Sequence, residues 1–216
     1  MTTLITGASR GVGRALVDHL TAAGETVIGT CRTAPAAGWL ALDVTDPDSI
    51  AAMGRAMEGR PLDLLVCNAG IYLEKGQRLE DGFPSAMWAQ TFATNVTGVF
   101  GTIQALLPNL RASQGAKIAI ISSQMASDTH APGGSYIYRA SKAAALNLGR
   151  NLAADLAREG ISVGIYHPGW VQTDMGGRSA DITPAEAARG LAARFAALSP
   201  ATTGCFETWD GRPHPF

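Results

Sequence analysis

The chain lacks the features that mark several large classes of protein. Only 16% of its 216 residues are charged, the net charge is -1, and the lysines and arginines form no basic stripe. The charge pattern therefore gives no support to a nucleic acid partner. No apolar run approaches the roughly 20 residues of a membrane-spanning helix. The N-terminus has no basic segment followed by a cleavage site, so we expect neither a membrane protein nor a secreted one.

Cysteine is also scarce. Cys31, Cys67 and Cys205 show no Cys-x-x-Cys spacing, and the four histidines stand at no ligand spacing. This pattern is typical of reduced thiols, so we expect a cytoplasmic protein without a metal site. No linker rich in proline, glycine or serine divides the chain, and no repeat stands out. Residues 1–216 are therefore expected to form a single domain.

Short apolar runs alternate with longer helical patterns along the chain. The predicted strands are residues 2–6, 26–30, 39–42, 62–67, 117–122, 161–166 and 205–209. The predicted helices are residues 11–23, 47–57, 84–110, 137–158 and 184–197, and the connection 32–38 is too short for a full helix. Near-continuous apolar strands favour a sheet buried on both faces. The alternation predicts an α/β fold, with a doubly wound, mostly parallel, seven-stranded sheet and helices on both faces.

A glycine-rich turn follows the first predicted strand and opens the first predicted helix. It reads Thr6-Gly7-Ala8-Ser9-Arg10-Gly11-Val12-Gly13. Glycines allow a tight turn and a close approach of the backbone to a phosphate, and the helix N-terminus offers free N–H groups. The spacing differs from the commoner Gly-x-Gly-x-x-Gly fingerprint, and no Gly-Lys-Ser/Thr follows as it would in a Walker loop. We interpret the turn as a nucleotide-binding site.

Tyr138 and Lys142 are four residues apart and therefore share one face of a predicted helix. The pKa of a free phenol is about 10, and an ammonium beside it favours the phenolate. Lowering that pKa by about three units would need roughly 4 kcal/mol. We expect Lys142 to lower the pKa of Tyr138 in this way and so to make an acid/base matched to neutral pH. The alternative is a solvated helix face. Tyr136 competes for the role, but it stands six residues from Lys142.

Seven motifs, spread in order over the whole chain, resemble those of the short-chain dehydrogenase/reductase family. The resemblance implies a Rossmann-like fold. The seven motifs are Thr6-Gly7-x3-Gly11-x-Gly13, Leu42-Asp43-Val44, Asn68-Ala69-Gly70, Asn95, Ser122-Ser123, Tyr138-x3-Lys142 and Pro168-Gly169. The runs at residues 133–142 and 167–177 and the tail Trp209-Asp210-Gly211 resemble the C-factor-like branch of carbonyl reductases.

The resemblance implies a nicotinamide dinucleotide cofactor. The residues that it assigns to cofactor binding are Gly7, Ser9, Arg10, Gly11, Val12, Gly13, Arg32, Asp43, Val44, Asn68, Ala69, Gly70, Tyr138, Lys142, Pro168, Gly169, Val171 and Thr173. An acidic residue at the end of the second strand would favour NAD(H), but the chain has Thr30-Cys31-Arg32 there. Arg10 and Arg32 could hold a 2′-phosphate, so we expect NADP(H) rather than NAD(H). The alternative is that either arginine is a solvated surface residue.

Some of these assignments have simpler alternatives. By resemblance, Asp43 and Val44 meet the adenine ring, and Asn68 lies near the adenine ribose unless it serves only the turn. Thr173 is expected to hydrogen-bond the carboxamide, or else to form only a local turn through its hydroxyl.

The resemblance also assigns the reacting groups. Tyr138 gives the proton, Ser123 polarises the substrate carbonyl with Ser122 as the alternative, and Lys142 supports Tyr138 and the nicotinamide ribose. Asn95 holds a water that links Lys142 to solvent, unless it is a solvent-facing side chain. The predicted function is the NADPH-dependent reduction of a small ketone or aldehyde to an alcohol. The alternative is a cofactor-binding signalling or regulatory protein with little turnover.

The substrate site is expected to be open, because residues 168–184 are too few and too rich in glycine for a substantial lid. Its predicted walls are Met125, Tyr72, Tyr136, Trp170 and Met175; the alternative for each is a place in the core. The helix at residues 137–158 resembles the one that builds dimers in the family, which would give a homodimer or homotetramer. The alternative is a free surface helix, which would also carry charged residues such as Asp155, Arg158 and Glu159.

Overall fold

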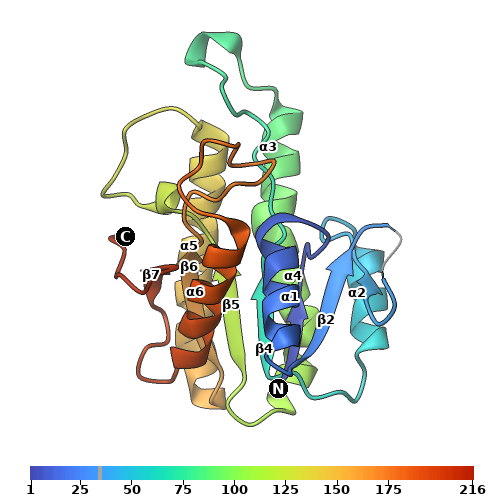
Figure 1. Cartoon of the computed structure of the whole chain (residues 1–216). Helices are drawn as coiled ribbons and strands as arrows, with labels where there is room; N and C mark the ends of the chain where they lie inside the picture. Colours follow the sequence, from blue (N-terminus) through green and yellow to red (C-terminus); the bar gives the residue numbers. More distant parts are fainter. Residues whose placement is uncertain (34–35) are drawn as a thin grey trace.

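The computed structural model describes residues 1–33 and 36–216. The strands in these ranges are β1 (Thr2–Ile5), β2 (Thr26–Cys31), β3 (Leu40–Ala41), β4 (Leu64–Cys67), β5 (Lys117–Ile121), β6 (Ser162–His167) and β7 (Phe206–Thr208). These seven form one sheet in the order β3-β2-β1-β4-β5-β6-β7, and every neighbouring pair is parallel (Figure 1). The strand order reverses between β1 and β4, where sheets of this type bind ligands at the carboxyl edge.

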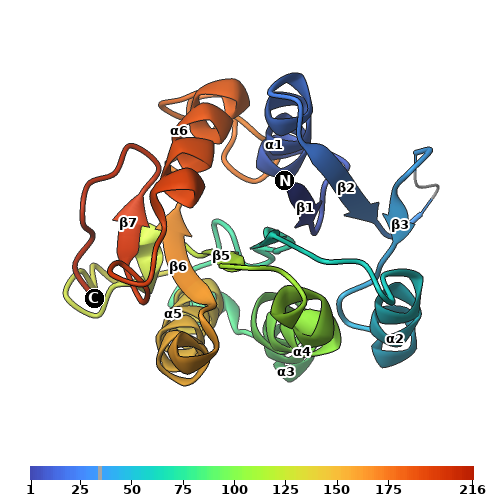
Figure 2. The ribbon, with the colours of Figure 1, turned by 90° about the horizontal axis from the view of Figure 1, so that it is seen from below.

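The helices cover both faces of the sheet. They are α1 (Gly11–Ala22), α2 (Pro47–Ala56), α3 (Ser85–Phe92), α4 (Gly98–Arg111), α5 (Tyr136–Leu156) and α6 (Pro184–Ala197). Figure 2 shows α1 and α6 on one face and α2, α4 and α5 on the other. The predicted doubly wound fold is thus confirmed. None of the helices in the described ranges is long and apolar enough to cross a membrane.

Successive residues of the central strands point to opposite faces, so each strand serves two core layers. Leu4 of β1 packs in the layer that contains Ile103 and Leu106 of α4. Its neighbour Ile5 packs in the layer that contains Leu16 of α1 and Phe195 of α6. Burial on both faces explains why the strands read as near-continuous apolar runs.

The helix predicted at residues 84–110 is confirmed as one continuous run of helical residues, 85–111, but the sequence did not reveal a change of hydrogen-bonding pattern inside it. A π-helical turn, Ala93–Thr97, separates α3 from α4. A π-helical turn has hydrogen bonds between residues five apart instead of four. Such turns occur as bulges inside α-helices and are frequent at functional sites. Asn95 lies in this turn, and its side chain bonds the backbone of a neighbouring loop instead of facing solvent. The predicted connection 32–38 includes residues 34 and 35, which lie outside the described residues.

Candidate active site

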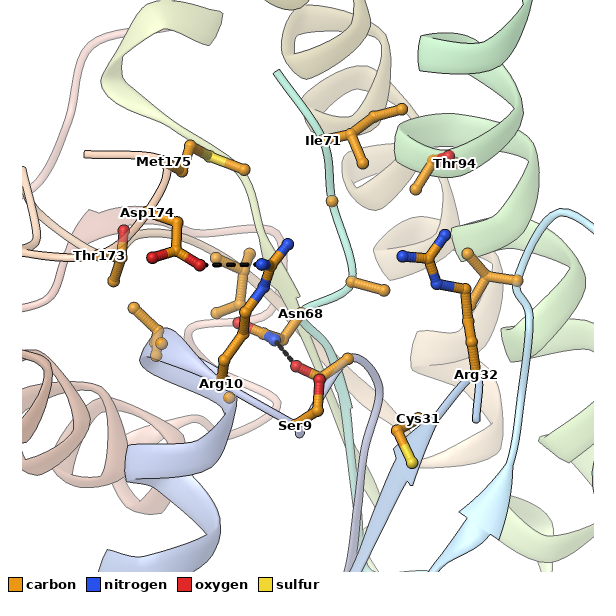
Figure 3. A pocket seen from close by; sticks show the side chains of 18 of the residues that line it. Ser9, Arg10, Cys31, Arg32, Asn68, Ile71, Thr94, Thr173, Asp174 and Met175 are labelled. Atoms are coloured by element: carbon orange, nitrogen blue, oxygen red, sulfur yellow. Dashed lines mark hydrogen bonds and ion pairs between the residues drawn. The ribbon is translucent and has the colours of Figure 1, made fainter. Parts of the chain in front are cut away.

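A cleft of about 890 Å³ opens at the carboxyl edge of the sheet (Figure 3). Residues that follow β1, β2, β4, β5 and β6 line it, so it lies across the point where the strand order reverses. Every residue that the sequence assigns to the cofactor lines this cleft except Gly169 and Val171. Val171 is buried in a bridge to Ile182, and a side chain on Gly169 would meet Ile182 and Trp209. Both residues therefore pack behind the residues that line the cleft and do not line it themselves.

The glycine turn takes a shape that larger residues could not adopt. Gly7 has φ +65°, and a Cβ there would stand 2.9 Å from the Cα of Ala69. A Cβ on Gly13 would collide with the carbonyl oxygen of Gly7 and with Nδ2 of Asn68. α1 starts directly after Arg10 with no side-chain cap among the described residues. Its first N–H groups are thus left for a ligand that approaches the turn.

Asn68 holds the glycine turn against the end of β4. Its Nδ2 donates to the carbonyl oxygens of Thr6 (2.9 Å) and Gly7 (3.1 Å). The hydroxyl of Thr6 in turn accepts from the backbone N–H groups of Asn68 and Ala69, each at 3.0 Å. These bonds favour the alternative in which Asn68 shapes the turn, although the residue also lines the cleft.

The two arginines reach over the cleft from different elements, Arg10 from the turn and Arg32 from the end of β2 (Figure 3). Nη1 of Arg10 lies 2.8 Å from Oδ2 of Asp174, and both side chains are largely exposed. Asp43, after β3, accepts from the N–H and hydroxyl of Thr45, and these bonds, with a smaller effect of Arg32, lower the pKa of its carboxyl. The sequence analysis gave Asp174 no role, although the residue lies in the run 167–177.

Tyr138 and Lys142 lie one turn apart on α5 and both line the cleft. They are 7% and 5% exposed, so a solvated helix face is excluded. Nζ of Lys142 donates to the carbonyl of Ile121 at 2.9 Å and lies 5.6 Å from the centre of the Tyr138 ring. The phenol hydroxyl lies 4.0 Å from Sδ of Met175. The ammonium of Lys142 thus lies close to the Tyr138 ring and is held there by the backbone of β5.

The sequence predicts a lowered pKa for Tyr138, but in the structure this pKa is raised. Burial raises the pKa of Tyr138 above its ordinary value, the Ser123 hydroxyl opposes this rise, and Tyr72 and Glu74 add to it. Burial also lowers the pKa of Lys142 to about 8. Desolvation disfavours the charged form of each group, and it is the largest cause of both shifts. The phenol is therefore protonated at neutral pH.

The two serines after β5 have separate contacts. Ser122 donates its hydroxyl to the backbone carbonyl of Lys142 at 3.0 Å, which anchors α5 to the sheet. Oγ of Ser123 accepts from the N–H of Met125 at 3.1 Å. The Ser123 hydroxyl also opposes the rise in the pKa of the Tyr138 phenol. Ser123 is therefore the serine better placed to act together with Tyr138.

Asn95 is 1% exposed, so its solvent-facing alternative is wrong. Its Nδ2 donates to the carbonyl of Ile71 (2.9 Å) and to Oγ of Ser141 (3.0 Å), and its Oδ1 accepts from the N–H of Ile71 (2.9 Å). A Cβ on Gly70 would stand 3.4 Å from both Oδ1 of Asn95 and Nζ of Lys142. Asn95 thus joins the loop after β4 to α5 directly beside Lys142.

Aromatic neighbours separate the competing tyrosines. Tyr72 stacks on Tyr138, with ring centres 4.4 Å apart. Tyr136 is 38% exposed and packs edge-on against Phe83, so it points away from the cleft wall that holds Lys142. Glu74, which no motif of the sequence marks, is buried and accepts from the backbone N–H of Tyr138 at 2.5 Å.

No helix lies between residues 168 and 183 of the described chain, which confirms the predicted lack of a lid helix. The hydroxyl of Thr173 accepts from the N–H of Gly176 at 3.1 Å, as its local-turn alternative requires, while the residue still lines the cleft. Met175 reaches over the phenol, and Lys75 holds its backbone carbonyl at 2.7 Å. The tip of this segment thus crosses the mouth of the site.

Comparison with known proteins agrees with the geometry. The family described as short chain dehydrogenase matches residues 1–182. The 1-hydroxy-2-glutathionyl-2-methyl-3-butene dehydrogenase of Rhodococcus sp. (strain AD45) is 34% identical, over 97% of each chain. The C-signal protein of Myxococcus xanthus is 33% identical over 72% of this chain and 93% of its own. An NADPH-bound carbonyl reductase from chicken fatty liver superposes with a TM-score of 0.89 at 31% identity, covering 100% of this chain and 98% of its own.

Proposed function

This chain belongs to the short-chain dehydrogenase family, and on that premise we propose that it reduces a ketone or aldehyde with NADPH, with Tyr138 as the general acid. The observation that carries the proposal is the buried pair Tyr138 and Lys142 in the wall of a long cleft that begins at the glycine turn. A nucleotide held by the turn and a carbonyl compound beside Tyr138 would occupy one continuous space.

The residues present fit a nicotinamide dinucleotide phosphate. The turn leaves no room for a side chain at Gly13, and α1 presents its first N–H groups where a pyrophosphate would lie. Arg10 and Arg32 would hold the 2′-phosphate, since no carboxylate ends β2. Bound there, the cofactor supplies a hydride. The chicken carbonyl reductase, which has NADPH in its structure, supports this choice over NADH.

Side chains of the protein would donate the proton and then replace it. Its raised pKa keeps Tyr138 in the protonated form that a carbonyl oxygen needs from a donor. Ser123 would share the developing negative charge on that oxygen. Lys142 has a pKa of about 8 and is thus mostly charged at neutral pH, so it favours the phenolate that remains after proton transfer. Asn95 would hold the loop and would also hold a water beside Lys142. That water would link Lys142 to solvent, and the proton would be replaced along this route.

A second candidate is a cofactor-binding signalling protein with little turnover. The likeness to the C-signal protein of Myxococcus xanthus favours it. Steady-state NADPH oxidation with a panel of aldehydes, ketones and quinones separates the two. We expect turnover with several members of the panel and weaker activity with NADH. Tight NADPH binding without turnover of any compound would reject the reductase and favour the second candidate.

A further inference from the structure

Glu74 lies in the loop between β4 and α3, which Figure 1 shows rising beyond the carboxyl edge of the sheet. The side chain is 1% exposed. A buried carboxylate costs free energy unless hydrogen bonds or a positive partner compensate it. One oxygen, Oε1, accepts from the backbone N–H of Tyr138 at 2.5 Å. The other, Oε2, is buried and meets no donor in the described part of the chain.

The bond from Tyr138 to Glu74 takes the place of an ordinary helix cap. α5 begins at Tyr136, and its N-cap residue Ser135 is left-handed (φ +52°) with no capping bond from its side chain. The N–H of the third helical residue is the group that a capping side chain normally satisfies. Glu74 satisfies it from more than sixty residues away, and its charge lies at the positive end of the helix.

The same loop holds Tyr138 at two further points. The ring of Tyr72 stacks on that of Tyr138, and its hydroxyl bonds the hydroxyl of Ser135. Ile71 is held by Asn95 through both its N–H and its carbonyl. The loop therefore ties the π-helical turn to the first turn of α5, and Glu74 makes the contact to the backbone of the reacting residue itself.

Within residues 1–33 and 36–216, few titratable groups lie around the Tyr138 phenol. Tyr72 and Glu74 approach from the loop, and Lys142 lies one turn further along α5. Lys75 follows Glu74 in the sequence, but its ammonium donates to the carbonyl of Met175. Arg139 lies next to Tyr138 on α5, and its Nη1 approaches the carbonyl of His130. Glu74 makes no ion pair within residues 1–33 and 36–216.

We propose that Glu74 is a positioning residue for Tyr138: it fixes the first turn of α5 and places a negative charge where it favours the protonated phenol. The inference rests on the proposed reductase function. It explains how the phenol keeps its proton beside the ammonium of Lys142, which favours the opposite form. It also biases the site toward carbonyl reduction, which starts from the phenol, over alcohol oxidation, which starts from the phenolate.

Two substitutions separate the backbone contact from the charge. Glu74→Gln keeps an acceptor for the N–H of Tyr138 and removes the charge, whereas Glu74→Ala removes both. Glu80→Gln and Glu80→Ala are the matched controls, because Glu80 lies in the same loop and is exposed. Reduction and oxidation are followed against pH, and hydrogen exchange of the peptide amides at residues 136–142 reports on the first turn of α5.

For Glu74→Ala we expect faster exchange in that turn and a fall in kcat of roughly tenfold, with KM and NADPH affinity near the wild-type values. Glu74→Gln should restore most of kcat for reduction and move the rise of alcohol oxidation to lower pH. The Glu80 variants should match the wild type. Glu74→Ala with wild-type kcat and exchange would overturn the positioning role, and an unmoved oxidation profile in Glu74→Gln would overturn the role of the charge. If the wild type reduces no carbonyl compound, the function proposal fails, while hydrogen exchange still decides whether Glu74 holds the turn.

Discussion

Replacing Lys142 by methionine should stabilise the fold while it abolishes the reaction. Lys142 is 5% exposed, and burial lowers its pKa from 10.5 to about 8. That difference corresponds to about 3 kcal/mol of free energy by which the fold disfavours the ammonium. The hydrogen bond to the carbonyl of Ile121 is lost with the lysine, at a cost of about 1 kcal/mol. Methionine fills a similar volume, so we expect a net gain of about 2 kcal/mol in the free energy of unfolding near neutral pH.

The gain should depend on pH with a defined sign. Below pH 8 Lys142 is charged in both the folded and unfolded chains, so the whole penalty is present. Between about 8 and 10.5 the unfolded chain still binds the proton and the folded chain does not, so wild-type stability rises relative to the variant. Above 10.5 the ammonium is neutral in both states, and only the lost hydrogen bond remains. The advantage of methionine should therefore vanish or reverse in alkaline solution.

Urea unfolding of the wild type and of Lys142→Met, at neutral pH and at about pH 10, measures both statements. Lys75→Met is the matched control, because Lys75 is exposed and its loss should change stability by no more than about 0.5 kcal/mol at either pH. A methionine variant that is less stable than the wild type at neutral pH, or a stability difference that does not change with pH, would refute the reasoning.

Three further predictions concern the cleft. Arg32→Ala should weaken NADPH binding roughly tenfold or more and leave NADH binding nearly unchanged, as measured by fluorescence titration; equal losses for both cofactors would count against the assigned 2′-phosphate contact. Gly13→Ala should abolish tight binding of both cofactors, because a Cβ there collides with the turn, and an unchanged dissociation constant would contradict this. Asn95→Ala should lower the free energy of unfolding by about 2 kcal/mol, since two backbone groups of Ile71 lose their partner. Asn151→Ala is the control, because Asn151 is exposed on α5 and its side chain bonds Asn147 one turn away; an Asn95→Ala loss smaller than the control's would be inconsistent with that account.

The fold could be predicted from the sequence because its strands, helices and first turn each have a signal in the local sequence. Apolar runs gave the strands, and the glycines after residue 6 marked the first turn. The helix at residues 84–110 was predicted without its π-helical turn, in which Asn95 bonds Ile71 of a loop distant in the sequence. Periodicity along one helix carries no information about such a contact.

The candidate site was predictable where spacing alone identifies a group. Tyr138 and Lys142 fall on one helix face by count, and the cleft does contain both. The direction of their pKa values was not predictable, because it depends on burial that only the packed structure supplies. Glu74 had no sequence signal, since an acidic residue in a loop is ordinarily solvated. Asp174 lies in the run 167–177, but nothing in that run indicates its ion pair with Arg10.

The central claim is that Tyr138 donates the proton in an NADPH-dependent reduction. Tyr138→Phe tests it most directly, because phenylalanine keeps the ring that stacks on Tyr72 and removes only the hydroxyl. We predict that kcat for a carbonyl substrate falls about 100- to 10,000-fold while the dissociation constant for NADPH stays near that of the wild type. A variant that reduces the substrate at the wild-type rate would contradict the claim.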